Sequence, residues 1–139
     1  MRRLPLFIAA AGLAAIAGGT AVVASSAASP LSAKDQTKLD KALAGKTAGS
    51  SQTCIPLTQI RDTIYVGNRT ILYRVSSNLV YRNDPPGGCP GLREGSGLIT
   101  RTTTGQLCSG DIAQVRDFSA GFSAGSCALG DFTPYRTAK

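Results

Sequence analysis

Histidine and tryptophan are both missing from this chain of 139 residues. Without histidine, the Ser-His-Asp and Cys-His hydrolase mechanisms are excluded, and so is ribonuclease chemistry that uses histidine as acid and base. Metal sites built on imidazole ligands are excluded for the same reason. We therefore expect no histidine-dependent catalysis and no metal site.

Paired carboxylates are the enzymatic route that remains, but acidic residues are scarce, with eight in the whole chain. Glu94 is the one glutamate, and it lies in a glycine-rich loop that lacks the burial needed to make a carboxyl group a general acid. Asp111 and Asp117 stand about one strand length apart and are interpreted as turn residues or ion-pair partners. We predict no catalytic residue and no cofactor, and expect a protein that is not an enzyme.

A long hydrophobic run without any charged residue is present near the N-terminus, over residues 4–24. It follows two arginines and leads into a cluster of small residues, the order that a secretory signal peptide requires. We predict a signal over residues 1–28, with cleavage after Ala24 or Ala28, and export to the periplasm or the extracellular space. The alternative is an uncleaved membrane anchor, since about 20 apolar residues can span a bilayer. The many alanines and glycines of the run favour the cleaved signal.

Positive charge exceeds negative charge, with fifteen basic residues against eight acidic ones and a net charge of +7. Two arginines would leave with the signal, so the exported part keeps thirteen bases and eight acids, a net charge of +5. These charges stand singly along the chain, which disfavours nucleic acid as a partner. A modest positive charge suits a solvated surface as well as an anionic partner.

The chain beyond the signal divides into two predicted regions, residues 29–53 and residues 54–136. In the first, the Ser-Ala-Lys-Asp sequence at 32–35 resembles a helix capping box. Leu39 and Leu43 are four residues apart and share a face, which predicts a short helix. A stretch rich in glycine, serine and threonine follows the helix and is interpreted as a flexible linker.

The second region has the composition of short β-strands, dense in β-branched and aromatic residues and divided by turn residues. No long helical period occurs in it. Strands are predicted over residues 63–66, 70–75, 79–82, 98–103 and 112–116, with another around Phe132. We predict an all-β domain, a small antiparallel β-barrel or rolled sheet of five to six short strands, preceded by the signal peptide and the short helix with its linker.

Four cysteines lie in the predicted β domain, at Cys54, Cys89, Cys108 and Cys127. A domain of about 80 residues has a marginal core, and an even number of cysteines in an oxidising compartment predicts disulfides. Four cysteines can pair in three ways, of which we favour Cys89–Cys108 with Cys54–Cys127, the second tying together the ends of the domain. A zinc site is disfavoured because the cysteines are 35, 19 and 19 residues apart, whereas zinc ligands come in close pairs.

Four arginines in or beside the predicted strands are candidate binding residues: Arg69, Arg74, Arg82 and Arg101. Arginines and tyrosines on a small sheet can stack against and clamp an anionic polymer, a glycan or a nucleic acid. Tyrosines 73 and 81 directly precede two of these arginines, so the two members of each pair point to opposite faces of a strand. That alternation favours a simpler interpretation, in which the tyrosines are core residues and the arginines surface residues.

Short motifs surround the cysteines. They are Cys54-Ile55-Pro56-Leu57, Ile60-Arg61-Asp62-Thr63, Arg69-Thr70-Ile71-Leu72, Val80-Tyr81-Arg82-Asn83, Cys89-Pro90-Gly91-Leu92, Cys108 with Asp111-Ile112, and Cys127-Ala128-Leu129-Gly130 with Phe132 and Pro134. Over residues 54–134 the chain resembles a family of small exported proteobacterial proteins of unknown function. Such relatives often carry acidic residues where this chain has Gly67-Asn68. The resemblance implies an exported, disulfide-bonded domain and supplies no catalytic residue.

These observations predict an exported, non-enzymatic module with a binding or envelope-accessory role. One more specific hypothesis is a binder of an anionic envelope polymer that uses the arginine-bearing strands. Another is an inhibitor of an extracellular enzyme that uses the loop from Pro85 to Leu92. The expected partners are therefore an envelope component or an extracellular protein, and a membrane is expected only through the signal segment if it is uncleaved.

Overall fold

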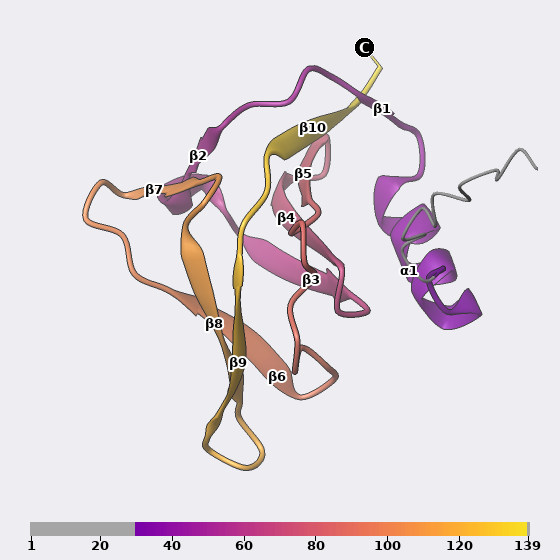
Figure 1. Ribbon diagram of the computed structural model, residues 1–139. Coiled ribbons are helices and arrows are strands. Elements are labelled where there is room, and N and C mark those ends of the chain that lie inside the picture. Colours follow the sequence, from indigo (N-terminus) through magenta and orange to yellow (C-terminus); the bar gives the residue numbers. More distant parts are fainter. Residues whose placement is uncertain (1–29, 139) are drawn as a thin grey trace, which may run out of the picture.

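The computed structural model describes residues 30–138 of the chain (Figure 1). The signal peptide predicted for residues 1–28, with its cleavage sites, lies outside the described residues. The elements run in the order α1 (Ala33–Leu43), β1 (Lys46–Ala48), β2 (Cys54–Pro56), the short 3₁₀ helix η1 (Leu57–Gln59), β3 (Asp62–Val66), β4 (Thr70–Ser76), β5 (Leu79–Asn83), β6 (Ser96–Thr100), β7 (Gln106–Cys108), β8 (Ile112–Asp117), β9 (Ser123–Ala128) and β10 (Phe132–Thr137). In this part of the chain, no helix is long and apolar enough to cross a membrane.

The strands form three antiparallel sheets. A five-stranded sheet has the order β1-β10-β5-β4-β3, a three-stranded sheet has the order β6-β8-β9, and β2 pairs with β7. The predicted all-β antiparallel class, with a short helix before it, is confirmed. The described chain beyond Cys54 holds nine strands, β2 to β10, rather than the five to six that the sequence predicts.

Four strands were not predicted, namely β1, β2, β7 and β9. The β9 strand consists of serine, alanine, glycine and cysteine, which have little intrinsic preference for strands. It forms because β8 supplies hydrogen-bonding partners along its length and because Cys127 is bonded to Cys89. Tertiary pairing rather than local propensity therefore makes β9 a strand.

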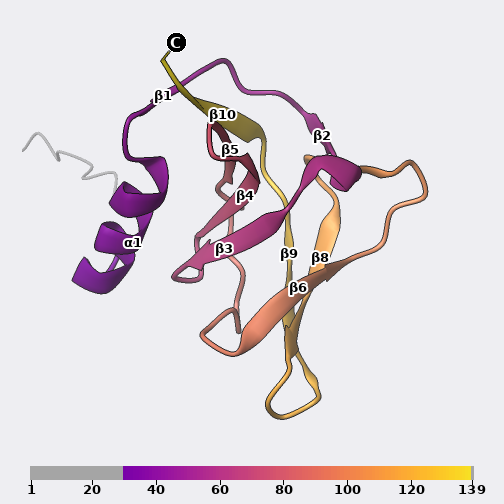
Figure 2. The same cartoon turned by 180° about the vertical axis from the view of Figure 1, so that it is seen from behind.

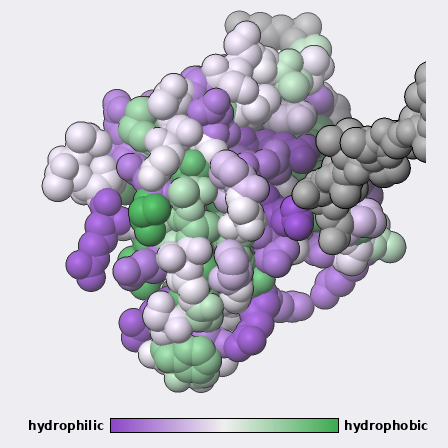
Figure 3. Space-filling model, in the orientation of Figure 1, coloured by the Kyte–Doolittle hydropathy of each residue, from purple (hydrophilic) through white to green (hydrophobic). Residues whose placement is uncertain are grey.

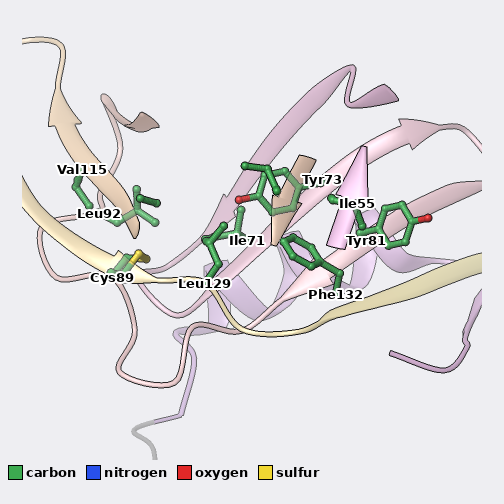
Figure 4. Close-up of a cluster of buried hydrophobic side chains, with 12 residues drawn as sticks. Ile55, Ile71, Tyr73, Tyr81, Cys89, Leu92, Val115, Leu129 and Phe132 are labelled. Carbon is green, nitrogen blue, oxygen red and sulfur yellow. A yellow bond between two sulfur atoms is a disulfide. The ribbon is translucent and has the colours of Figure 1, made fainter. Parts of the chain in front are cut away.

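The main hydrophobic core lies between the sheets and takes side chains from all three (Figure 4). Ile55 comes from β2, Val115 from β8, and Phe132 from β10, and each is at most 1% exposed. The rings of Tyr73 and Phe132 pack at a tilt, with their centroids 5.8 Å apart. One core thus joins the three sheets into a single packed unit.

The helix α1 covers the other face of the five-stranded sheet. Figures 1 and 2 both show it across that sheet from β6, β8 and β9. The Ser32 side chain accepts a hydrogen bond from the backbone N–H of Asp35 at 3.1 Å, which confirms the predicted N-cap. Leu39 is buried and packs with Leu72 and Val80 of the sheet. The sheet is therefore covered on both faces. This explains why the first four residues of β4, Thr70 to Tyr73, are all buried although they point alternately to the two faces.

The sequence predicts a flexible linker after α1, but part of this segment is an ordered strand. Residues Lys46–Ala48 form β1, which pairs antiparallel with the end of β10. Further along, Gln52 and Phe132 form an isolated bridge. The free hydrogen-bonding edge of β10 orders this polar segment, whose own side chains carry no strand signal.

The disulfides join Cys54 to Cys108 and Cys89 to Cys127, so both are present but the favoured pairing is wrong. Cys54 and Cys108 stand directly opposite each other on β2 and β7, with their Cα atoms 4.0 Å apart. The Cα atoms of Cys89 and Cys127 are 4.8 Å apart. The predicted tie between Cys54 and Cys127 fails because the pairing of β2 with β7 places Cys108, not Cys127, opposite Cys54.

The Tyr73 side chain gives the fold a marked dependence on alkaline pH. It is 4% exposed, and its hydroxyl has no hydrogen-bond partner among the described residues. Burial raises the pKa of Tyr73 well above its ordinary value of 10.0, and the nearby Tyr65 raises it further. The unfolded chain can therefore ionise this tyrosine from about pH 10 upward while the folded protein keeps it neutral.

The stabilisation linked to neutral Tyr73 is complete below pH 10 and is lost as the pH rises above that value. We expect the free energy of unfolding to fall by up to about 1.4 kcal/mol per pH unit through this one group. Urea unfolding of the wild type and of Tyr73→Phe between pH 9 and about pH 11.5 measures the difference. Lysine deprotonation contributes to the pH dependence of both proteins, so only the difference between them reports on Tyr73. Equal pH dependence in the two proteins would contradict the prediction.

Candidate functional site

The lysines of α1 gather on one flank of the helix. Lys34, Lys38 and Lys41 are spaced at i, i+4 and i+7, which places them along one side over about 10 Å of helix axis. Leu39 points toward the sheet and fixes the rotation of the helix, so this flank lies beside the buried face rather than opposite it. The same spacing is visible in the sequence and is the signal that could have identified these residues.

Two hollows follow this flank of α1, with volumes of about 860 and 680 Å³, and Lys38 and Lys41 line both. The first is also lined by Lys34 and by Arg93 of the loop between β5 and β6. The second is also lined by Lys46 of β1 and contains one of the predicted arginines, Arg74 of β4. We refer to the two hollows together as the lysine groove.

Acidic side chains occupy part of the lysine groove. Lys34 Nζ lies 3.2 Å from a carboxylate oxygen of Glu94, and Arg74 Nη1 lies 3.5 Å from one of Asp62. All four of these side chains are exposed, so both ion pairs are screened by water and contribute little. A ligand carrying several negative charges can therefore compete for these cations.

Three lysines of the groove, Lys38, Lys41 and Lys46, form no salt bridge within the part of the chain that the structure describes. They stand on two elements, α1 and β1, that β10 and the sheet hold in place. The groove therefore presents a row of cations on an ordered scaffold, an arrangement whose charge suits an anionic ligand.

No family model matches the chain, and neither does any curated protein or any solved structure. The resemblance to exported four-cysteine proteins stays a prediction.

The four predicted binding arginines do not form one site. Arg74 alone lines the groove, whereas Arg69 lies in the turn between β3 and β4 and Arg101 is exposed after β6. Arg82 Nε donates to Asp84 at 2.8 Å. Burial lowers the pKa of Arg82, but the hydrogen bond and charge of Asp84 outweigh this and raise it overall, so Arg82 stays charged and is already paired with Asp84.

The tyrosines that precede two of these arginines are core residues, as the simpler interpretation holds. Tyr73 and Tyr81 are buried in the main core, while Arg74 and Arg82 project from the opposite face of the sheet. An aromatic clamp that combines these tyrosines with these arginines is therefore sterically impossible in this fold.

The two aspartates weighed as catalytic candidates have turn and ion-pair roles, as the sequence predicts. Asp111 accepts a hydrogen bond from the backbone N–H of Cys108 at 2.7 Å, which closes the turn before β8. Asp117 is buried and is paired with Arg93. Among the described residues, no group of three or more side chains suited to metal binding comes together.

Proposed function

We propose that this protein is an exported, non-enzymatic module that binds an anionic polymer of the cell envelope in the lysine groove. The observation that carries the proposal is the row of Lys38, Lys41 and Lys46 on ordered elements, extended by Lys34 and Arg74. Two disulfides and the uncharged apolar run at residues 4–24 support export to the periplasm or the extracellular space.

A polymer suits this groove better than a small anion. The cations are exposed, so each contact with a phosphate or carboxylate group is weak on its own. Contacts repeated along a chain of anions add up, and they release the counterions that the polymer holds in solution. Binding is therefore expected to be tight at low salt and to weaken steadily as salt is added.

A charge-reversal experiment tests the groove. Lys38→Glu/Lys41→Glu is expected to weaken binding of polyphosphate or polyglutamate at low salt by roughly tenfold or more, because two unpaired cations become anions. Fluorescence anisotropy of labelled polymer across a salt series measures the affinity and its salt dependence.

The matched control is Arg101→Glu/Arg136→Glu, which makes the same change in net charge at two exposed arginines outside the groove. We expect this control to weaken binding by less than about threefold. Equal losses in the two double variants would show that affinity follows net charge alone, and the groove would then not be the binding site.

The alternative of an enzyme inhibitor that uses the loop from Pro85 to Leu92 gains less support. Pro85, Cys89 and Leu92 are all buried, so much of this loop is directed into the protein rather than toward a partner.

A further inference from the structure

The turn between β8 and β9 exposes two phenylalanines. Phe118 is 66% exposed and Phe122 is 53% exposed, which makes them two of the most exposed large apolar side chains among the described residues. The hairpin projects from the lower end of the molecule in Figure 1, and Figure 3 shows an apolar surface at that end. Aromatic side chains left in water at a protruding tip are typical of a surface that contacts a partner.

The tip is held in one conformation by a buried carboxylate. Asp117 accepts hydrogen bonds from the backbone N–H groups of Ser119 at 2.9 Å and Ala120 at 3.0 Å, and it is paired with Arg93. The backbone N–H of Asp117 donates to Phe122 at 3.0 Å, which closes the hairpin. The two rings therefore project from an ordered turn, and little conformational entropy is lost when they bind.

The Phe118 ring rests on a glycine of the neighbouring strand. A Cβ atom at Gly97 of β6 would come within 2.7 Å of this ring, so the glycine lets the ring lie directly against the strand. Gly97 is the register partner of Arg116 on β8, which places that arginine beside the ring. The contact orients Phe118 while leaving most of its surface open.

Two arginines stand at the base of the tip. Arg116 Nη2 donates to the backbone carbonyl of Gly121 within the tip at 3.0 Å. The Arg93 side chain is 62% exposed even though it pairs with buried Asp117. A protruding aromatic tip with guanidinium groups at its base complements a surface that is apolar inside and anionic outside.

We propose that the tip of the β8–β9 hairpin docks on an anionic lipid surface. Phe118 and Phe122 enter the boundary between headgroups and acyl chains, while Arg116 and Arg93 contact lipid phosphates. The two exposed rings stand beside exposed guanidinium groups, a combination that matches acyl chains beneath lipid phosphates and favours lipid over a protein partner. Arg93 also lines the lysine groove, whereas the two phenylalanines and Arg116 lie outside it, so docking through the tip would bring the groove to polymers at a membrane surface.

Vesicle binding tests the proposal. The protein is mixed with vesicles of phosphatidylglycerol and phosphatidylcholine in equal parts, and with vesicles of phosphatidylcholine alone, and the bound fraction is measured by sedimentation. We expect binding to the first and much less to the second. Phe118→Ser/Phe122→Ser is expected to lower the partition coefficient roughly 100-fold, because two aromatic side chains no longer leave water.

Three further variants make the result specific. Ile112→Ser removes a side chain that is 59% exposed at the other end of β8, and we expect it to bind vesicles like the wild type. Phe122→Ser alone keeps the Phe118–Gly97 contact and should lower partitioning roughly tenfold. Lys38→Glu/Lys41→Glu, which alters the groove, should reduce vesicle binding less than the loss of both phenylalanines.

Several outcomes would overturn the proposal. Wild-type protein that does not bind anionic vesicles would do so, and so would a Phe118→Ser/Phe122→Ser variant that binds them as well as the wild type. Binding that depends on Lys38 and Lys41 but not on the phenylalanines would assign the vesicle contact to the groove. A partner protein that requires Phe118 and Phe122, found together with no vesicle binding, would make the tip a protein-docking site.

Discussion

Replacing Cys89 and Cys127 by alanine should lower the free energy of unfolding by about 4 kcal/mol or more. The bridge closes a loop with a sequence separation of 38 residues, and its loss frees the unfolded chain. Both cysteines are also buried in the main core, so their removal leaves unfilled space there. Urea unfolding of the oxidised proteins measures the change.

The natural control is Cys54→Ala/Cys108→Ala. This bridge has a longer sequence separation, 54 residues, but lies in the half-exposed pair of β2 and β7. We expect it to contribute about 4 kcal/mol through loop closure, with a smaller loss of packing. A Cys89→Ala/Cys127→Ala variant as stable as the wild type would contradict the central place of this bridge.

Counting thiols in the same series tests the pairing. Cys89→Ala/Cys127→Ala keeps the bridge between Cys54 and Cys108 and should show no free thiol. Cys89→Ala/Cys108→Ala breaks both bridges and should leave two free thiols per chain, because Cys54 faces position 108 across β2 and β7 whereas Cys127 faces Ala113 across β9 and β8. A native-like bridge between Cys54 and Cys127 in that variant would reverse the assignment.

Gly91→Ala should destabilise the protein by at least about 3 kcal/mol, the second large effect expected here. Gly91 has φ +82°, and a Cβ atom there would overlap the backbone carbonyl of Ala124 on β9. The contact is reciprocal, since a Cβ atom at Gly125 would overlap the carbonyl of Pro90. Two backbones therefore touch directly beside the bridge from Cys89 to Cys127, and neither can move away without disturbing that bridge.

Gly105→Ala is the matched control for backbone strain. Gly105 also has a left-handed conformation, φ +71°, but a Cβ atom there would meet nothing within 4 Å. We expect this variant to lose only about 1 to 2 kcal/mol, the strain of a left-handed alanine. The difference between the two variants isolates the steric overlap. Urea unfolding that gives equal losses would show that Gly91 is needed for its φ angle alone.

Local signals predicted the helix and the hairpins of the five-stranded sheet. Ser32 and the acid three residues later predicted the start of α1, because a capping interaction needs only neighbouring residues. β-branched and aromatic residues on both sides of the Ser77-Asn78 turn predicted β4 and β5 within one residue of their bounds. Antiparallel strands joined by a short turn are likewise determined over a short span of sequence.

The lysine groove was only partly accessible from sequence. The spacing of Lys34, Lys38 and Lys41 shows that they share a helix flank, but it does not show what that flank faces. The predicted arginines were scattered for the same reason: strand alternation gives the face of each residue, whereas strand order decides which residues become neighbours. Arg74 joined the lysines only because α1 packs across β4 and β5.

By itself, the sequence determined the all-β class, the capped helix and the use of all four cysteines in disulfides. Each follows from residue type and near-neighbour spacing, or from the marginal core of a small domain. The tertiary structure decided which cysteines pair, because β2 and β7 meet only in the folded protein. It also made β9 a strand, since serine, alanine and glycine acquire that conformation from the hydrogen bonds of β8 and the bond to Cys89.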